Sequence, residues 1–195
     1  MRYFNENNYK DWSNDEKYLS SISEESKYLK NGNERVKIRF YNDRIVVTKS
    51  NVIHPITTIY TYYPSSKALK AMGKDFYQSP FGITKEYDEQ GKLIKETNWD
   101  KPYKISIDDV VAKVKEKYNI NLENREEKSS LKRNIPPQLN NQPIYVANLA
   151  IKDEPYKMKY VLIDGTTGDI LYETEFYIKG RGKNPFSEYL KSLKK

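Results

Sequence analysis

The sequence contains no cysteine and only one histidine, His54, among its 195 residues. The lack of cysteine excludes disulfides, thiolate zinc sites and cysteine nucleophiles. A single histidine provides no histidine pair for a metal, and no nucleophile-elbow motif accompanies it. The glycine-rich motifs that bind phosphates or dinucleotides are also missing. We therefore expect no enzyme activity, no catalytic residue, no bound metal and no cofactor.

Long apolar runs are missing as well. No stretch approaches the ~18 apolar residues of a membrane-spanning helix, and no signal peptide is recognisable. The polar, asparagine-rich start after Met1 is compatible with the removal of an export signal or a lipidated cysteine. We expect a periplasmic protein or a membrane-anchored lipoprotein, with a cytoplasmic location as the alternative.

The chain is poor in apolar residues but rich in tyrosine. The apolar share is 37%, and 18 residues are Tyr. Tyrosine can bury its ring while its hydroxyl stays hydrated, so it suits both sheet packing and protein interfaces. The net charge of +7 favours an acidic partner, which could be a protein face, nucleic acid or an anionic surface.

The first half of the sequence predicts a helix followed by antiparallel strands. Ser13 to Glu16 form a capping box, and apolar residues follow at helical spacing, so we expect a helix over 14–30. Strict alternation predicts a strand over 36–40. Further strands are expected over 45–47 and 56–63.

Residues 62–99 contain a weak internal repeat. The segment 62–70 aligns with 87–95: each has Tyr, turn-prone residues, and then Lys, two mostly apolar residues and Lys. Each copy predicts the end of a strand, a tight turn and the next strand. The pattern resembles hairpin repeats of the MORN type, variants of which occur in bacterial antitoxin-like and lipoprotein sequences.

The second half predicts a helix over 106–118, capped by Ser106 with Asp109 at its third position. One face of this helix is apolar, made by Ile107, Val110, Val111, Val114 and Tyr118. A long loop is expected over 121–142. Strands then follow at 144–151, 157–163 and 169–178. A short amphipathic helix is expected in the tail, with Phe186, Tyr189, Leu190 and Leu193 on one face.

These elements predict an α+β fold made of two helix-plus-antiparallel-sheet units. We expect a flexible N-terminus over 1–12 and a helix-plus-meander unit over 13–101. The second unit, with its helical tail, is expected over 102–195.

Residues 105–178 resemble a PepSY-like domain. The strand 144–149 looks like the family's first strand, and 160–164 looks like its tyrosine-bearing strand ending in Asp. The turn at 167–171 is similar to the family's terminal turn of a small residue, Gly, an acid and two aliphatics. The inserted loop 121–142 departs from the pattern. The resemblance implies an exported, non-catalytic domain that binds or restrains peptidases and other partners.

Together the resemblances favour a binding protein that neutralises another protein, such as a bacterial immunity protein against a secreted toxin. The alternatives are a PepSY-like envelope protein that binds or inhibits a peptidase or another ligand, and a binder of nucleic acid or an anionic surface. Aromatic anchors rimmed by lysines would suit an acidic partner. The expected partner-binding residues are Tyr62, Tyr63, Tyr77, Phe81, Tyr87, Trp99, Lys92 and Lys95. The same aromatic rings could instead pack in the core of the sheet.

Overall fold

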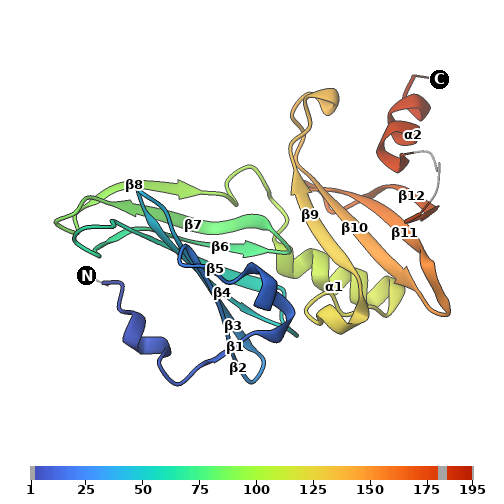
Figure 1. Cartoon of the computed structure of the whole chain (residues 1–195). Coiled ribbons are helices and arrows are strands. Elements are labelled where there is room, and N and C mark those ends of the chain that lie inside the picture. Colours follow the sequence, from blue (N-terminus) through green and yellow to red (C-terminus); the bar gives the residue numbers. More distant parts are fainter. Residues whose placement is uncertain (1–2, 180–183, 195) are drawn as a thin grey trace. The chain divides into compact units, whose positions relative to one another are not determined.

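The computed structural model describes residues 3–179 and 184–194. The protein is mostly β, with one eight-stranded and one four-stranded antiparallel sheet (Figure 1). The chain divides into two compact units, Met1–Trp99 and Asp100–Lys195. The two α-helices of the described residues, α1 (Ile107–Tyr118) and α2 (Pro185–Ser192), both lie in the second unit. The predicted α+β class with two helix-plus-sheet units is therefore wrong.

The first unit is a meander in which each strand pairs antiparallel with the next strand along the chain. Its 3₁₀ helices are η1 (Glu6–Tyr9) and η2 (Glu16–Ser21). Its strands are β1 (Ser13–Asn14), β2 (Ser26–Asn31), β3 (Glu34–Phe40), β4 (Ile45–Asn51), β5 (Ile56–Tyr62), β6 (Leu69–Phe76), β7 (Ser79–Tyr87) and β8 (Leu93–Asn98). Both copies of the weak repeat adopt the predicted strand–turn–strand conformation, across β5–β6 and β7–β8.

The predicted helix over 14–30 is wrong. A two-residue turn at Gly32-Asn33 joins β2 to β3, and Gly32 has a φ of +54°, which glycine adopts without steric cost. Residues 26–30, which the helical spacing of apolar residues assigned to the end of a helix, therefore form the first strand of a β-hairpin. Asp15 caps only the 3₁₀ helix η2, through its side chain and the Lys17 amide.

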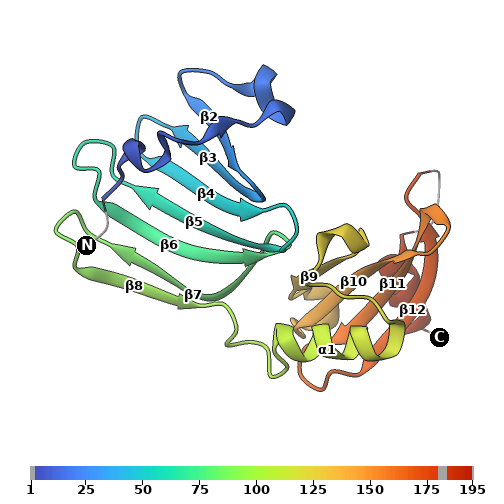
Figure 2. The same ribbon diagram turned by 90° about the horizontal axis from the view of Figure 1, so that it is seen from below.

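One face of the eight-stranded sheet, here called the covered face, is packed by the N-terminal segment. Phe4, Tyr9 and Trp12 contact a buried cluster whose members include Val36, Ile38, Ile45, Val47, Tyr62 and Leu69. The Phe4 amide donates to the Lys67 carbonyl in the turn before β6, and β1 pairs with β2. The segment between these two contacts therefore crosses the strands that lie between β6 and β2 (Figure 2). Residues 3–12, part of the expected flexible N-terminus, thus cover the hydrophobic core on this face of the sheet.

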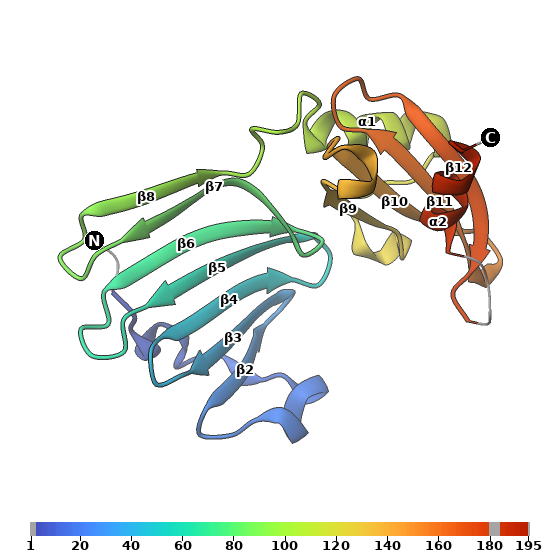
Figure 3. The same cartoon turned by 90° about the horizontal axis from the view of Figure 1, so that it is seen from above.

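The opposite side of the sheet, here called the open face, is visible in Figure 3. One row of neighbouring residues crosses it from β2 to β8: Tyr28, Lys37, Thr48, Ile59, Gly73, Thr84 and Thr97. Adjacent members pair across the strands except Gly73 and Thr84, where a register shift interrupts the β6–β7 pairing. All seven are half-buried and none is fully buried. Within the first unit, η2 lies over the β2 end of this face, where Tyr18 stacks on Tyr28.

The second unit has a four-stranded sheet in the order β12-β11-β10-β9. Its strands are β9 (Ser130–Asn134), β10 (Ile144–Ile151), β11 (Glu154–Asp164) and β12 (Ile170–Tyr177). The predicted helix over 106–118 is confirmed as α1, with the Ser106–Asp109 capping box formed. Val110, Val111 and Val114 are buried, as the apolar stripe predicts. The short tail helix is confirmed as α2, whose Tyr189 packs with Tyr160 and Leu162 of β11.

The predicted loop over 121–142 contains ordered elements. These are the 3₁₀ helices η3 (Arg125–Glu127) and η4 (Pro137–Leu139), with β9 between them. Leu122, Leu131 and Leu139 are buried, so the segment belongs to the core. The sequence did not reveal this role in the core, because the buried leucines are isolated from one another by polar residues and prolines and form no periodic pattern.

Candidate functional site

The eight residues predicted to bind a partner do not lie on one surface. Tyr62 and Tyr87 pack in the cluster of the covered face. The Tyr63 hydroxyl donates to the Tyr87 carbonyl at 2.9 Å. Tyr77, in the β6–β7 turn with a φ of +46°, and Phe81 both pack edge-on against Phe76. Trp99 remains 41% exposed.

Some lysines of the same region form ion pairs within the sheet. Lys95 pairs with Glu86, and Lys85 pairs with Glu96, each at 3.0 Å between the Nζ and carboxylate atoms. Lys92 is exposed in the β7–β8 turn, where its amide bonds the Asp88 carboxylate. The β7–β8 hairpin thus balances much of its own charge.

A different cluster combines tyrosines and cations, and we call it the basic tyrosine patch: Tyr18, Tyr28, Lys37, Arg39 and Tyr41. The rings of Tyr18 and Tyr28 stack with centroids 4.8 Å apart and planes 20° apart. The Lys37 Nζ lies 5.0 Å from the centre of the Tyr28 ring, and Arg39 Nη1 donates to the Tyr41 hydroxyl at 3.3 Å. Cations over aromatic faces are held by the ring quadrupole.

The electrostatics of the patch are set by unbalanced positive charge. Hydrogen bonding to Arg39, followed by that to Lys37, lowers the pKa of Tyr28 below its ordinary value. Within residues 3–179 and 184–194, neither Lys37 nor Arg39 forms an ion pair with a carboxylate. Tyr18 and Tyr41 are 37% and 40% exposed. The patch can therefore present rigid rings, and cations that have no carboxylate partner among the described residues, to an anionic surface.

The local fold explains why these residues meet. On β3 the even-numbered Val36 and Ile38 point to the covered face, so Lys37 and Arg39 point to the open face. Hairpin register places Tyr28 directly opposite Lys37. Sequence reasoning found the alternation on β3 but missed Tyr28, because it assigned that residue to a helix. The Gly32-Asn33 pair, directly before the alternating run of β3, was the available signal for a hairpin turn.

A pocket of about 290 Å³ lies next to the patch, between η2 and the strands β2 to β4. Asp15 and Arg35 line it, and their ion pair has a distance of 3.0 Å between Nε and Oδ2. Lys37, Thr48 and Ser50 complete its polar wall. Because Asp15 balances Arg35, Lys37 provides the net positive charge of this pocket.

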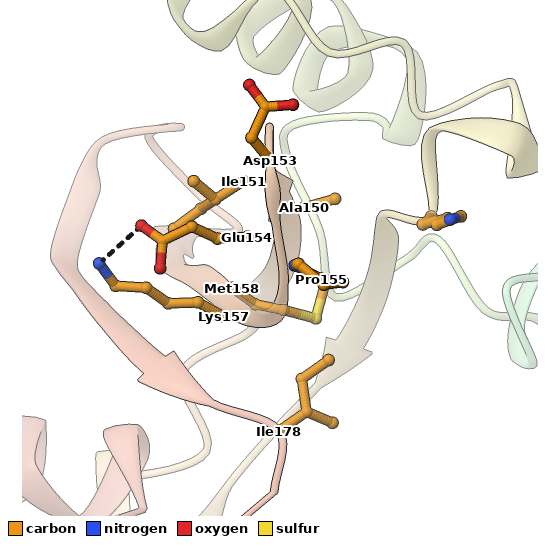
Figure 4. A pocket seen from close by; sticks show the side chains of 9 residues that line it. Ala150, Ile151, Asp153, Glu154, Pro155, Lys157, Met158 and Ile178 are labelled. Atoms are coloured by element: carbon orange, nitrogen blue, oxygen red, sulfur yellow. Dashed lines mark hydrogen bonds and ion pairs between the residues drawn. The ribbon is translucent and has the colours of Figure 1, made fainter.

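A second, apolar pocket lies in the other unit, at the end of the β10–β11 hairpin (Figure 4). Its volume is about 330 Å³, and Ile151, Pro155, Met158 and Ile178 contribute apolar surface. Lys157 and Glu154 form an ion pair at its rim, with 3.4 Å between Nζ and Oε1. The pocket is large enough for a small apolar ligand or an inserted side chain.

The turn that carries the PepSY resemblance is a structural hub. The Asp164 carboxylate accepts from the amides of Thr166 and Thr167 at 2.6 and 3.2 Å, and from the Gln142 side chain at 2.5 Å. Gly165 leaves no space for a side chain, because a Cβ there would lie 2.8 Å from the Pro143 carbonyl oxygen. These residues have structural reasons to be present, apart from any partner.

His54 is exposed in the loop between β4 and β5. Among the described residues, no group of three or more His, Asp or Glu side chains is arranged to hold a metal ion. No helix in that part of the chain has the length and apolar composition needed to cross a membrane. The comparisons with protein families, with curated proteins and with solved structures each gave no match.

Proposed function

We propose that the protein is a non-catalytic binding protein that neutralises a partner protein with an acidic face, as a bacterial immunity protein neutralises a secreted toxin. The observation that carries the proposal is the basic tyrosine patch on the open face of the eight-stranded sheet. The resemblance of residues 62–99 to antitoxin-like repeats supports the same function.

The chemistry of the patch favours an acidic protein surface. Tyrosine provides a large, rigid contact area at low conformational cost, and rings of this kind often supply most of the binding energy of an interface. Lys37 and Arg39 have no carboxylate partner among the described residues, so an acidic partner would gain charge pairs without breaking existing ones. The net charge of +7 would speed the encounter.

Nucleic acid fits the patch less well. Bases bind single-strand proteins by stacking on aromatic faces. Here Tyr18 and Tyr28 stack on each other, and Lys37 lies over the Tyr28 ring, so neither face of Tyr28 is left for a base. A protein partner needs only the edges and hydroxyls of these rings together with the cations.

The test is a binding measurement with the product of the adjacent gene, co-expressed and then purified. The double variant Lys37→Glu with Arg39→Glu should weaken the complex at least tenfold, and Tyr28→Ala should also weaken it. The control is Lys101→Glu with Lys104→Glu, which changes the net charge equally at two exposed lysines of the second unit. This control should leave the affinity within twofold.

Several results would overturn the proposal. If the two double variants weaken binding equally, the net charge matters and the patch does not. If Lys92→Glu with Lys95→Glu is the more damaging change, the interface lies on the β7–β8 hairpin. If the adjacent product does not bind, or if an oligonucleotide binds through Lys37 and Arg39, the neutralising function is refuted. Thermal melts of each variant separate loss of binding from loss of folding.

The apolar pocket of the second unit favours a second candidate function. A PepSY-like envelope protein would use this domain to bind a peptidase or another ligand, and the pocket in Figure 4 is an uncovered apolar site on that domain. Met158→Lys would place a charge in the pocket and should abolish such binding. Binding of the adjacent product that depends on Met158, and not on Lys37, would favour this alternative.

A further inference from the structure

We propose that a groove at the β6–β8 side of the open face binds a cationic side chain, lysine or arginine, presented by the partner. We call it the Trp99 groove. Its volume is about 170 Å³. Its lining on the open face includes Ile59, Ala71, Gly73, Asp75, Thr84 and Trp99. The inference rests on the proposed binding role of this face.

The shape of the groove depends on one hydrogen bond and one glycine. The indole Nε1 of Trp99 donates to Thr84 Oγ1 at 2.8 Å, which fixes the ring as a wall. Gly73 lies in the floor, where a Cβ would come 2.7 Å from the same Thr84 oxygen. A glycine at this position therefore keeps both the depth of the groove and the orientation of the indole ring.

The groove holds a carboxylate without an ion-pair partner. Asp75 and Lys74 both line it, but no cation among the described residues, Lys74 included, forms an ion pair with the Asp75 carboxylate. Burial raises the pKa of the Asp75 carboxyl above its ordinary value. A bound cation would stabilise the ionised carboxylate and so offset the hydration that burial removes. Tryptophan is also the strongest aromatic partner for a cation.

The shape and the charge select the same ligand. The apolar wall accommodates the methylene stem of lysine or arginine, while the carboxylate and the indole ring contact its charged end. An acidic or purely apolar side chain would leave this half-buried carboxylate without a partner. The groove would bind a cationic group of the partner, and the basic tyrosine patch would bind acidic groups. Two sites of opposite preference on one face would fix the orientation of the partner.

The test uses N-acetyl-L-arginine amide as the probe and its uncharged analogue, N-acetyl-L-citrulline amide, as the matched ligand. The chain has two tryptophans, so Trp12→Phe leaves Trp99 as the single tryptophan reporter. Titration of this variant should give saturable fluorescence changes with the arginine probe and at least fivefold weaker binding of the citrulline probe. Binding should fall as the pH is lowered, and this fall should begin at a higher pH than an ordinary aspartate would give.

Asp75→Asn should weaken the arginine probe at least fivefold and remove its advantage over citrulline. The control Asp43→Asn, at an exposed aspartate paired with Arg44, should change nothing. Equal binding of the two probes, or an unaltered affinity in Asp75→Asn, would overturn the inference. Nuclear magnetic resonance shifts of the Gly73 amide provide a second readout if Trp12→Phe disturbs folding. Because the probe is a free amino-acid derivative, this test can fail while the partner experiment succeeds, and the converse also holds.

Discussion

Replacing Asp164 by alanine should destabilise the second unit because this carboxylate holds the β11–β12 turn. The side chain is 8% exposed and accepts three hydrogen bonds, two from backbone amides and one from Gln142. A donor left unsatisfied in a buried place costs roughly 1–3 kcal/mol, and bonds to charged groups are stronger. Some of these donors will find water in the variant, so we expect a loss of about 2–4 kcal/mol.

The chain itself provides the control for this experiment. Asp169 lies at the other side of the same turn, but its side chain is exposed and no hydrogen bond to its carboxylate occurs in the described residues. Asp169→Ala should therefore change the stability by less than about 0.5 kcal/mol. Asp164→Asn keeps one acceptor oxygen and should fall between the two alanine variants.

The measurement can distinguish the two units. Both tryptophans, Trp12 and Trp99, lie in the first unit, whereas both α-helices of the described residues lie in the second. In urea unfolding, Asp164→Ala should move the transition seen by far-ultraviolet circular dichroism of the helices more than the one seen by tryptophan fluorescence. If the Asp164 and Asp169 variants lose equal stability, the hydrogen-bonded turn does not have the role assigned to it.

Three further predictions concern the second unit. Val114→Asp should cost at least about 4 kcal/mol, because the side chain is fully buried on α1; an unchanged melting temperature would refute this helix face. Gly165→Ala should cost roughly 1–3 kcal/mol, because the new Cβ meets a backbone oxygen that cannot move away, and the cost is checked by urea unfolding. Burial raises the pKa values of Tyr145 and Tyr160 to about 12. Because the pKa of tyrosine in the unfolded chain is about 10, these side chains contribute their full stability below a pH of about 10, where both states hold the neutral hydroxyl. That stability should be lost as the pH rises from about 10 toward 12, and the two Tyr→Phe variants should reduce the loss seen in alkaline unfolding curves.

Local signals in the sequence were sufficient for the two α-helices and for the strands β10, β11 and β12 of the second unit. The capping box at Ser106 and the apolar stripe of α1 both act within one helix, so neighbouring residues determine the outcome. The Asp164–Gly168 turn is largely local, since the amides of Thr166, Thr167 and Gly168 donate to Asp164 two to four positions away, and of the hydrogen bonds that Asp164 accepts only the one from Gln142 is distant in the sequence. The strand β9 could not be predicted in this way, because it depends on pairing with β10 across η4.

The segment 14–30 shows how a nonlocal partner overrides local preference. Its apolar spacing and Ser13–Glu16 favoured a helix, although four serines between residues 20 and 26 weaken that preference. Pairing with β3 gives β2 a full ladder of hydrogen bonds from Ser26 to Asn31. The basic tyrosine patch was missed with it, because Tyr28 and Lys37 are neighbours only in the hairpin.

The low apolar content of the chain agrees with the architecture of the first unit. In a strand, alternate side chains point to opposite faces, so a sheet packed on one side needs apolar residues at only half of its positions. Val36, Ile38, Ile45 and Val47 fill the covered face under the N-terminal segment, and the intervening positions are free to be polar. Within the first unit, core packing therefore fixes the residues of the covered face more strictly than those of the open face. The basic residues Lys37 and Arg39, and the half-buried Asp75, lie on the open face and do not belong to the buried cluster of the covered face, which is the reason for proposing a recognition role for them.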